Sequence, residues 1–217
     1  MMVLTLLSFI LVLAGQTAGT IIEVPNGAQW GTWGTLDKCA PGTVAKGFTL
    51  KVQGMQGLYD DTALNGIRLH CSELKMRISS RSMRDHGTDE PKGAARRVQL
   101  KELPKVTDRW GKWGPTFWCP YGYLMAFSLR VEGSQGQGDD TAANNIKLKC
   151  SDGSILEGNG LYWGTYGDWS SNCTMGVCGI ESKVEDSQPV GDNTALNDVR
   201  FTCCDGQPTL HAQATGH

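Results

Sequence analysis

Three short acidic stretches are the residues of this chain whose type and spacing could do chemistry. Asp60-Asp61, Asp139-Asp140 and Asp192 each precede a Thr-Ala pair at a fixed spacing. Neighbouring carboxylates could bind calcium, or act as acid and base on a glycosidic bond. An active site normally occurs once, so a motif in three copies indicates turns in which side chains bond to backbone N–H groups. The expected turn residues are Asp60, Asp61, Thr62, Asn65, Asp139, Asp140, Thr141, Asn144, Asp192, Thr194 and Asn197.

Other candidates for catalysis or metal binding are few. No histidine has a partner in a nucleophile motif, and the chain lacks G-x-S-x-G. Acids outside the repeated motif leave an oligosaccharide-acting transferase or hydrolase as an alternative function. The cysteines include no CxxC pair, which disfavours zinc. We therefore expect no catalytic residue, no metal and no cofactor. The histidines are His70, His86, His211 and His217, and the acids outside the repeated motif are Glu132, Glu157 and Asp168.

The acidic stretches belong to a longer internal repeat. Residues 60–71, 139–150 and 192–203 are three versions of one twelve-residue segment that ends in cysteine. A Trp-Gly box, beginning at Trp30, Trp110 and Trp163, lies 41, 40 and 40 positions before that cysteine. A repeat of this length predicts a threefold array in which one unit alone cannot bury its apolar face.

Eight cysteines indicate disulfides, and the repeat restricts their pairing. Equivalent cysteines in equivalent units should pair alike, and the two left over should pair with each other. An exchange of partners in the third unit, 173 with 204 and 178 with 203, is the competing arrangement. The expected pairs are Cys39–Cys71, Cys119–Cys150, Cys173–Cys203 and Cys178–Cys204.

Alternating apolar and polar residues predict strands rather than helices. Segments 48–52, 67–71, 127–131, 146–150 and 199–203 show a period of two, which is typical of antiparallel sheets with one buried face. Three such sheets can hide their apolar faces only by turning inward, so we expect an all-β three-sided prism with pseudo-threefold symmetry.

The repeated tryptophans are expected in the interior of that prism. We expect Trp30, Trp110 and Trp163 to fill the centre between the sheets, because they recur in register. For the tryptophans later in each box we favour burial, with stacking on sugars as the alternative. These are Trp33, Trp113 and Trp169.

The remaining segments differ in composition from the repeats. Residues 1–19 contain a short apolar run followed by small residues, typical of a secretory signal peptide. We expect a single domain over 20–204, with repeats at about 22–71, 110–150 and 163–203, and a polar tail at 205–217. The basic, polar composition of an insertion at about 72–105 predicts a disordered loop. A basic run can also bind glycosaminoglycan or nucleic acid. The rest of the chain has a net charge of −2 − 4 = −6 and gives no nucleic-acid footprint.

The repeat motifs resemble the vitelline membrane outer layer protein 1 family. The resemblance runs from 22–24 to 203–204, apart from about 72–105, and rests on the W-G-x-W-G boxes, D-D-T-A-L-N-G-I-R-L-x-C, D-D-T-A-A-N-N-I and the terminal Cys-Cys. It implies a secreted β-prism of three antiparallel Greek-key sheets. It also implies a component of the outer layer of the egg vitelline membrane in birds, with homologues in secreted fluids.

The leading functional hypothesis is therefore a secreted, extracellular structural protein of a coat or fluid, acting as a monomer. Its expected partners are glycans or other coat proteins, and not nucleic acid or a membrane. A lectin-like glycan-binding protein is the alternative, by analogy with three-sheet prism folds that carry sugar sites in unrelated lectins. The candidate glycan-binding residues are Trp118, Tyr121, Tyr123, Tyr162 and Tyr166. Asn172 begins an N-glycosylation sequon, Asn-Cys-Thr.

Overall fold

A computed structural model describes residues 19–54, 64–73, 111–133, 142–185 and 196–205. This part of the chain contains β-strands and no helix. The strands are β1 (Ile21–Ile22), β2 (Thr32–Trp33), β3 (Asp37–Lys38), β4 (Thr43–Val52), β5 (Leu64–Glu73), β6 (Lys112–Trp118), β7 (Leu124–Val131), β8 (Ala143–Cys150), β9 (Ile155–Glu157), β10 (Thr165–Tyr166), β11 (Val177–Val184) and β12 (Leu196–Cys203).

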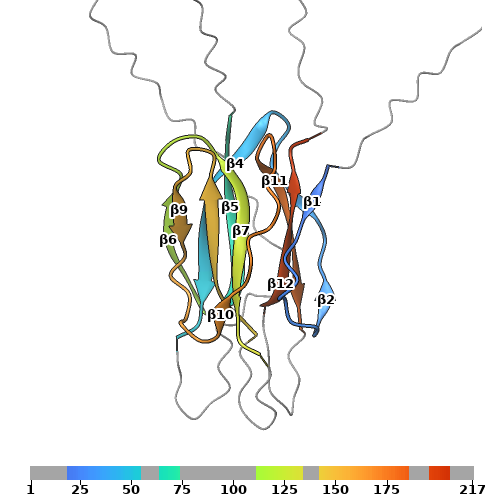
Figure 1. Ribbon diagram of the computed structural model, residues 1–217, viewed down its shortest axis with the longest axis vertical. Helices are drawn as coiled ribbons and strands as arrows, with labels where there is room; N and C mark the ends of the chain where they lie inside the picture. Colours follow the sequence, from blue (N-terminus) through green and yellow to red (C-terminus); the bar gives the residue numbers. More distant parts are fainter. Residues whose placement is uncertain (1–18, 55–63, 74–110, 134–141, 186–195, 206–217) are drawn as a thin grey trace, which may run out of the picture.

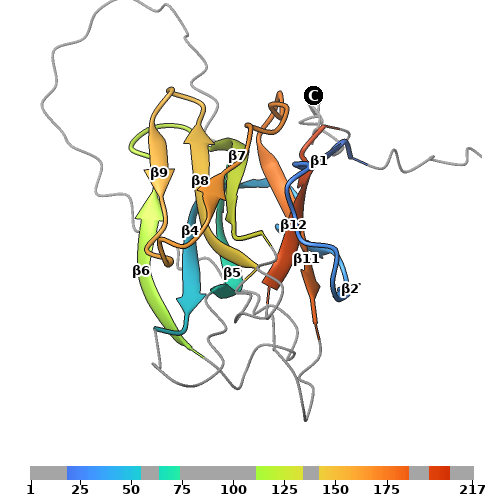
Figure 2. The ribbon, with the colours of Figure 1, turned by 60° about the horizontal axis from the view of Figure 1, so that its bottom comes forward.

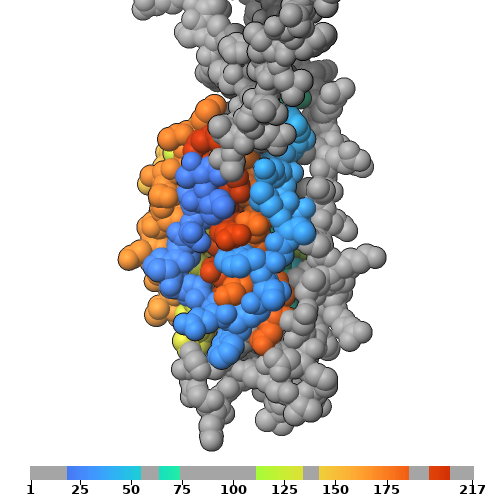
Figure 3. All heavy atoms as spheres, turned by 90° about the vertical axis from the view of Figure 1, so that its right-hand side faces the viewer, coloured from blue at the N-terminus to red at the C-terminus, as the bar shows by residue number. Residues whose placement is uncertain are grey.

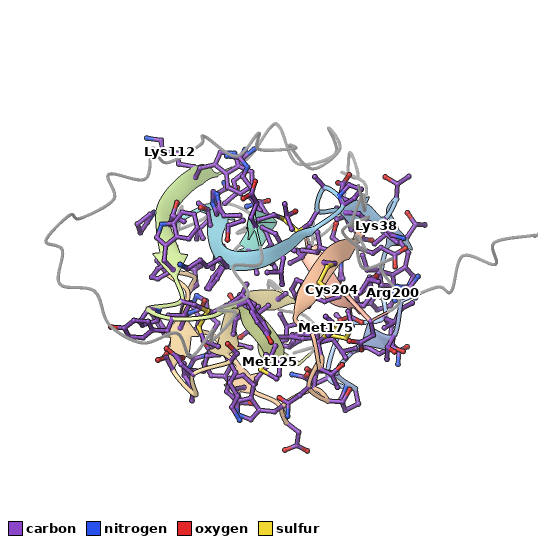
Figure 4. The ribbon with its side chains drawn as sticks, turned by 90° about the horizontal axis from the view of Figure 1, so that it is seen from above. Lys38, Lys112, Met125, Met175, Arg200 and Cys204 are labelled. Carbon is purple, nitrogen blue, oxygen red and sulfur yellow. A yellow bond between two sulfur atoms is a disulfide. The ribbon has the colours of Figure 1, made fainter. Side chains whose placement is uncertain are left out.

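The strands form three antiparallel sheets around one interior, which is a β-prism (Figures 1 and 2). Sheet A has the order β1-β12-β11-β2, with β3 also on β11; sheet B is β5-β4-β6; sheet C is β10-β7-β8-β9. In sheet C the fourth strand along the chain returns to lie beside the first, which is the Greek-key order. Figure 4, seen from above, shows side chains of all three sheets filling the space between them.

Each sheet combines strands from two neighbouring repeats. The central hairpins are β4–β5, β7–β8 and β11–β12, and each belongs to one repeat. The strand that contains the next Trp-Gly box then pairs on the edge of that hairpin: β6 on β4 and β10 on β7. The first box has no preceding hairpin, so β2 pairs with β11 at the other end of the chain. The N-terminal strands flank the β11–β12 hairpin in the same sheet, β1 on β12 and both β2 and β3 on β11, and so close the ring (Figure 3).

The interior is filled by the apolar face of the hairpins. Phe48, Phe127 and Phe201 are fully buried, and the rings of Phe127 and Phe201 meet edge to face at 4.8 Å. Leucine, isoleucine and valine from all three sheets complete the same cluster. Burying each such side chain contributes about 1.5–3 kcal/mol, so the shared core is the main force that holds the sheets together.

The box tryptophans do not fill this interior, contrary to the sequence-based prediction. Trp30 is 58% exposed and Trp163 is half-buried, while Trp110 lies outside the described residues. The reason is topological. Each box leads into an edge strand, and the prism axis is already occupied by residues of the central hairpins.

The box glycine, in contrast, is required by the fold at all three positions. Gly31, Gly111 and Gly164 have φ of 83°, 79° and 71°, where side chains are strained. A Cβ on Gly31 or Gly164 would lie 2.4 or 2.1 Å from the backbone at the end of β11 or β7. The glycine therefore allows the chain to pass directly against the sheet before it joins the edge.

Four disulfides connect the cysteines in the pairs that the repeat indicates, without the exchange in the third unit. They are Cys39–Cys71, Cys119–Cys150, Cys173–Cys203 and Cys178–Cys204. The first three each join the segment before a hairpin to the closing strand of the same hairpin. Their sequence separations of 32, 31 and 30 correspond to about 3–4 kcal/mol each in the chain-entropy model.

The asparagines of the repeated motif lie inside the closing strands. Asn65, Asn144 and Asn197 are 2%, 0% and 0% exposed, in β5, β8 and β12. The carbonyls of Asn144 and Asn197 accept hydrogen bonds from the N–H groups of Leu161 and Ala28, in the segments that lead to the next box. These asparagines therefore occupy the joints between units. The other expected turn residues, most of the basic insertion, the signal-peptide segment and most of the tail lie outside the described residues.

Candidate functional site

The five aromatic candidates do not form one site. Tyr123 comes directly before the first residue of β7, whereas Tyr166 pairs with Arg130 near its last residue. The two tyrosines are therefore about 20 Å apart along the strand. Trp118 ends β6 and Tyr121 follows it, so these two belong to the Tyr123 end. Tyr162 lies just before β10, with Tyr166. Each group must be considered separately.

Tyr123 has a structural position at one end of the prism. It packs against Val44 and the Cys178–Cys204 disulfide in a small cluster separate from the main core. Figure 4 looks down on this end and labels Cys204. A Cβ on Gly176 would come within 2.5 Å of Val44 and 2.6 Å of Tyr123, so three chain segments converge here. Tyr123 therefore closes the interior instead of presenting a binding surface.

Tyr166 belongs to a contact that is repeated in all three sheets. The second aromatic residue of each box lies beside the cation three positions before the closing cysteine. The distances from cation to ring centroid are 4.4 Å for Arg200 and Trp33, 4.0 Å for Arg68 and Trp113, and 4.0 Å for Lys147 and Tyr166. Cation–π pairs at such partly exposed sites are worth about 0.5–1 kcal/mol. They fasten each edge strand to its sheet, and they leave Trp33 and Trp113 half-buried.

Acidic side chains complete two of these contacts. Glu157 accepts a hydrogen bond from the Tyr166 hydroxyl at 3.1 Å and forms an ion pair with Lys147 at 3.4 Å. Burial and the nearby Glu157 charge raise the pKa of Tyr166, so the phenol stays protonated and donates. Glu181 pairs with Arg200 at 2.7 Å in sheet A. In sheet C, Glu157 is therefore a partner of both Tyr166 and Lys147.

Asp198 is the acid with the most perturbed environment in sheet A. Burial, opposed by the Val199 N–H and by Lys183, raises its pKa to about 6. Its Oδ1 accepts the Val199 N–H at 2.7 Å, as the Oδ1 of Asn145 accepts the Ile146 N–H at the equivalent place in sheet C. The sequence analysis did not single out Asp198. The aligned repeats have Asn144-Asn145 in the second unit and Asn197-Asp198 in the third, and this replacement of an amide by an acid could have identified Asp198.

Trp118 is the aromatic candidate with an open outer surface beside polar neighbours. It is 50% exposed, and a Cβ on Gly47 of the adjacent strand would lie 2.7 Å from its ring. The indole therefore lies across the glycine. The His70 ring is 5.2 Å away, and His70 Nε2 is 2.6 Å from Thr49 Oγ1, which is 3.0 Å from Thr116 Oγ1.

His70 supports this surface rather than acting as a catalytic base. It is on the outer side of β5, as expected, but it is only 9% exposed because neighbouring side chains cover it. Burial, with a smaller effect of Arg68, lowers the pKa of His70, so the imidazole is neutral at physiological pH. The neutral His70 ring is hydrogen-bonded to Thr49 and packs beside Trp118, and so helps to position the indole.

The other sequence-based candidates have surroundings that differ from those of Trp118. Tyr121 is 76% exposed, and its N–H is bonded to Asp152. Tyr162 is 60% exposed, with its ring 4.5 Å from that of Trp163. Asn172 is exposed and precedes the bridged Cys173. His86, His211, His217 and the Asp60-Asp61 pair lie outside the described residues, and within the described part no group of three or more His, Cys, Asp or Glu residues is placed to hold a metal ion.

The fold and these contacts define a disulfide-stabilised β-prism protein. Residues 20–206 match the family model for vitelline membrane outer layer protein I, and the chain belongs to that family. The human vitelline membrane outer layer protein 1 homolog is 44% identical over 88% of this chain and 84% of its own length. The mouse homolog is 42% identical over 85% of this chain and 83% of its own length.

Among solved structures, two plant proteins illustrate the distant similarities. Frutapin, a lectin from Artocarpus incisa, is 12% identical with a TM-score of 0.48, covering 86% of this chain and 97% of its own. Calystegia sepium agglutinin is 12% identical with a TM-score of 0.46, covering 85% and 95%. These scores carry no argument about function. No helix in the described residues is long and apolar enough to cross a membrane.

Proposed function

We propose that this protein is a secreted structural component of an extracellular coat, such as the outer layer of the egg vitelline membrane, or of a secreted fluid. The observation that carries the proposal is the attachment of every hairpin to its own flanking segment by a disulfide, in a chain of this family. Disulfides persist in oxidising, extracellular compartments. The signal peptide expected at residues 1–19 agrees with this proposal.

The arrangement of the repeated side chains also supports a structural role. The cations that lie against Trp33, Trp113 and Tyr166 are engaged in contacts within the molecule. The same contact recurs in each sheet, as expected of a scaffold and not of a single catalytic centre. A closed ring of sheets, with the first and last described strands, β1 and β12, paired in sheet A, suits a protein that must keep its shape outside the cell.

Secretion and assembly can be tested with the full-length chain in a secretory cell line and in the tissue that produces it. We expect protein in the medium whose N-terminus lies near Thr20 and whose eight cysteines are all oxidised. In tissue, immunogold labelling should mark an extracellular layer or the secreted fluid. Protein that stays in the cytosol with free thiols would contradict the proposal.

Glycan binding is the second candidate function, and the exposed surface of Trp118 favours it. An aromatic ring fixed by Gly47 and His70, with hydroxyl groups beside it, offers a flat face and polar edges of the kind that sugars use. A coat protein could use such a surface to attach to carbohydrate. A glycan array probed with the native protein and with Trp118→Ala tests this candidate, and a blank array across chitin-like, mucin and glycosaminoglycan sets would remove it.

A further inference from the structure

The three outer faces of the prism differ at one equivalent position. The residue before the first cysteine of each hairpin disulfide is Lys38 on sheet A, Trp118 on sheet B and Asn172 beside sheet C. The equivalence follows from the register, because Lys38 pairs with Gly179 as Trp118 pairs with Gly47. Since lysine and asparagine occupy this place in the other sheets, the fold does not require a tryptophan there.

One neighbour of Trp118, His70, is specific to sheet B, whereas the glycine recurs in sheet A as Gly179, which pairs with Thr202. Gly47 and His70 pair across β4 and β5, and the corresponding pair in sheet C is Ala126 and Lys149. Glycine allows the indole to lie flat, and the buried His70 packs beside it. Sheet B is therefore the face on which an aromatic ring is held rigidly with half of its surface open to solvent.

The charge of sheet B complements an anionic ligand. Strands β4, β5 and β6 contain four basic residues, Lys46, Lys51, Arg68 and Lys112, and one acid, Glu73, at the end of β5. Lys51 is only 6% exposed and Arg68 lies against Trp113, so the half-buried Lys46 and the exposed Lys112 are the cations of these strands that a ligand can reach. At the position where sheet A has Glu181 beside its cation, sheet B has Thr49. Lys112 is exposed, and Figure 4 shows it pointing away from the molecule at the edge of β6. In contrast, the strands of sheet A contain equal numbers of acids and bases, and those of sheet C contain three bases and one acid.

We propose that the outer face of sheet B binds an acidic glycan, a carbohydrate chain carrying sulfate or carboxylate groups, with Trp118 as the stacking surface. The sugar ring lies on the open face of the indole, and its anionic groups meet Lys46 of β4 and Lys112 of β6. Trp118 and Lys112 lie at opposite ends of β6, about 20 Å apart, so the bound chain spans several sugar units. This inference rests on the glycan-binding candidate and not on the structural role.

The test uses the full-length protein and three hexasaccharides: one derived from heparin, one from hyaluronan and the neutral chitohexaose. Calorimetry should detect binding of the two acidic probes that weakens as salt rises, and binding of the neutral probe at least about tenfold weaker. Trp118→Ala should reduce the affinity for the acidic probes by about tenfold, and Trp118→Phe should retain most of it. Lys112→Glu should reduce the affinity several-fold.

Trp169→Ala is the matched control, because Trp169 is 41% exposed and lies outside sheet B. Its affinity should equal that of the native protein, and thermal melting should show that each variant is folded. If Trp118→Ala does not fold, Lys112→Glu carries the test. Unchanged affinity in Trp118→Ala, or in Lys112→Glu where Trp118→Ala does not fold, would place binding elsewhere, for example on the basic residues between 74 and 110, and would overturn the proposal. Equal binding of the neutral probe, or no binding, would also overturn it. Either result leaves the test of secretion and coat assembly unaffected.

Discussion

Replacing Asp198 by asparagine should make the protein more stable at neutral pH and leave it unchanged in acid. Asp198 has a pKa of about 6 in the fold, compared with 3.8 for an ordinary aspartate. An acid whose pKa is raised by folding stabilises the fold below its ordinary pKa, and that contribution is lost as pH rises from about 4 to 6. Asparagine occupies the equivalent place in sheet C, where the Asn145 amide donates to the Gly158 carbonyl at 2.9 Å.

The size of the effect follows from the shift and its surroundings. A shift from 3.8 to about 6 corresponds to about 3 kcal/mol if the carboxylate were fully shielded from water. Asp198 is partly exposed, and Lys183 and Arg200 favour its charged form while Glu23 opposes it. Solvent screening and the loss of these attractions reduce the expected gain to about 1 kcal/mol at pH 7.5.

Urea unfolding with the disulfides intact, followed by fluorescence at pH 4 and pH 7.5, measures this difference. Asp198→Asn should match the native free energy of unfolding at pH 4 and exceed it at pH 7.5. Asp168→Asn, at an exposed position, is the control for a general change in net charge. A gain that is the same at both pH values, or a variant less stable at pH 7.5, would refute the electrostatic explanation.

Three further predictions concern the elements that close the prism. Gly164→Ala should lower the free energy of unfolding, measured in urea, by at least about 2 kcal/mol. Gly153 has a similar φ of 89° but open space around it, so Gly153→Ala should lower the free energy of unfolding by about 1 kcal/mol. Equal losses would show that the close approach of Gly164 to Val131 does not matter. Arg200→Gln loses the contacts with Trp33 and Glu181 and should lower the free energy of unfolding by about 1–2 kcal/mol. An unchanged urea midpoint would exclude a stabilising role for the cation–π contact. Replacing Cys178 and Cys204 together by serine should lower the melting temperature less than replacing Cys119 and Cys150 together. The first pair lies in the small end cluster, whereas the second lies in the main core. The reverse order of melting temperatures in calorimetry would contradict the separation of the end cluster from the main core.

The sequence predicted the part of the fold that repetition and alternation encode. The period of two in 48–52 and 127–131 places Phe48, Leu50, Phe127 and Leu129 in the core, where all four are fully buried. The three-sheet β-prism and the disulfide partners followed from treating the units as equivalent.

The pairing of each box with a neighbouring unit could not be read from the sequence. Strand alternation fixes which face is buried, but it does not say which hairpin an edge strand joins. The error on Trp30 has this origin, because recurrence in register suits both a central position and a repeated edge. The role of the second box aromatic was missed for a related reason: Trp113 and Arg68 are 45 positions apart and meet only when β6 returns to β4.

The candidate site was predicted only in part. The absence of a repeated counterpart identified Trp118, which is half exposed, but it also selected Tyr123, which closes the end of the prism. Sequence could not separate these two because their exposure depends on where three hairpins converge. The contact between His70 and Trp118 likewise depends on a strand register, and on a glycine in the strand between them.

Disulfide mapping of the secreted protein by partial reduction and mass spectrometry tests the central claim most directly. The account predicts that each unit is bridged only within itself, with Cys203 joined to Cys173 and the adjacent Cys204 to Cys178. A peptide that links a cysteine of one unit to a cysteine of another, or a secreted protein with free thiols at these positions, would contradict it.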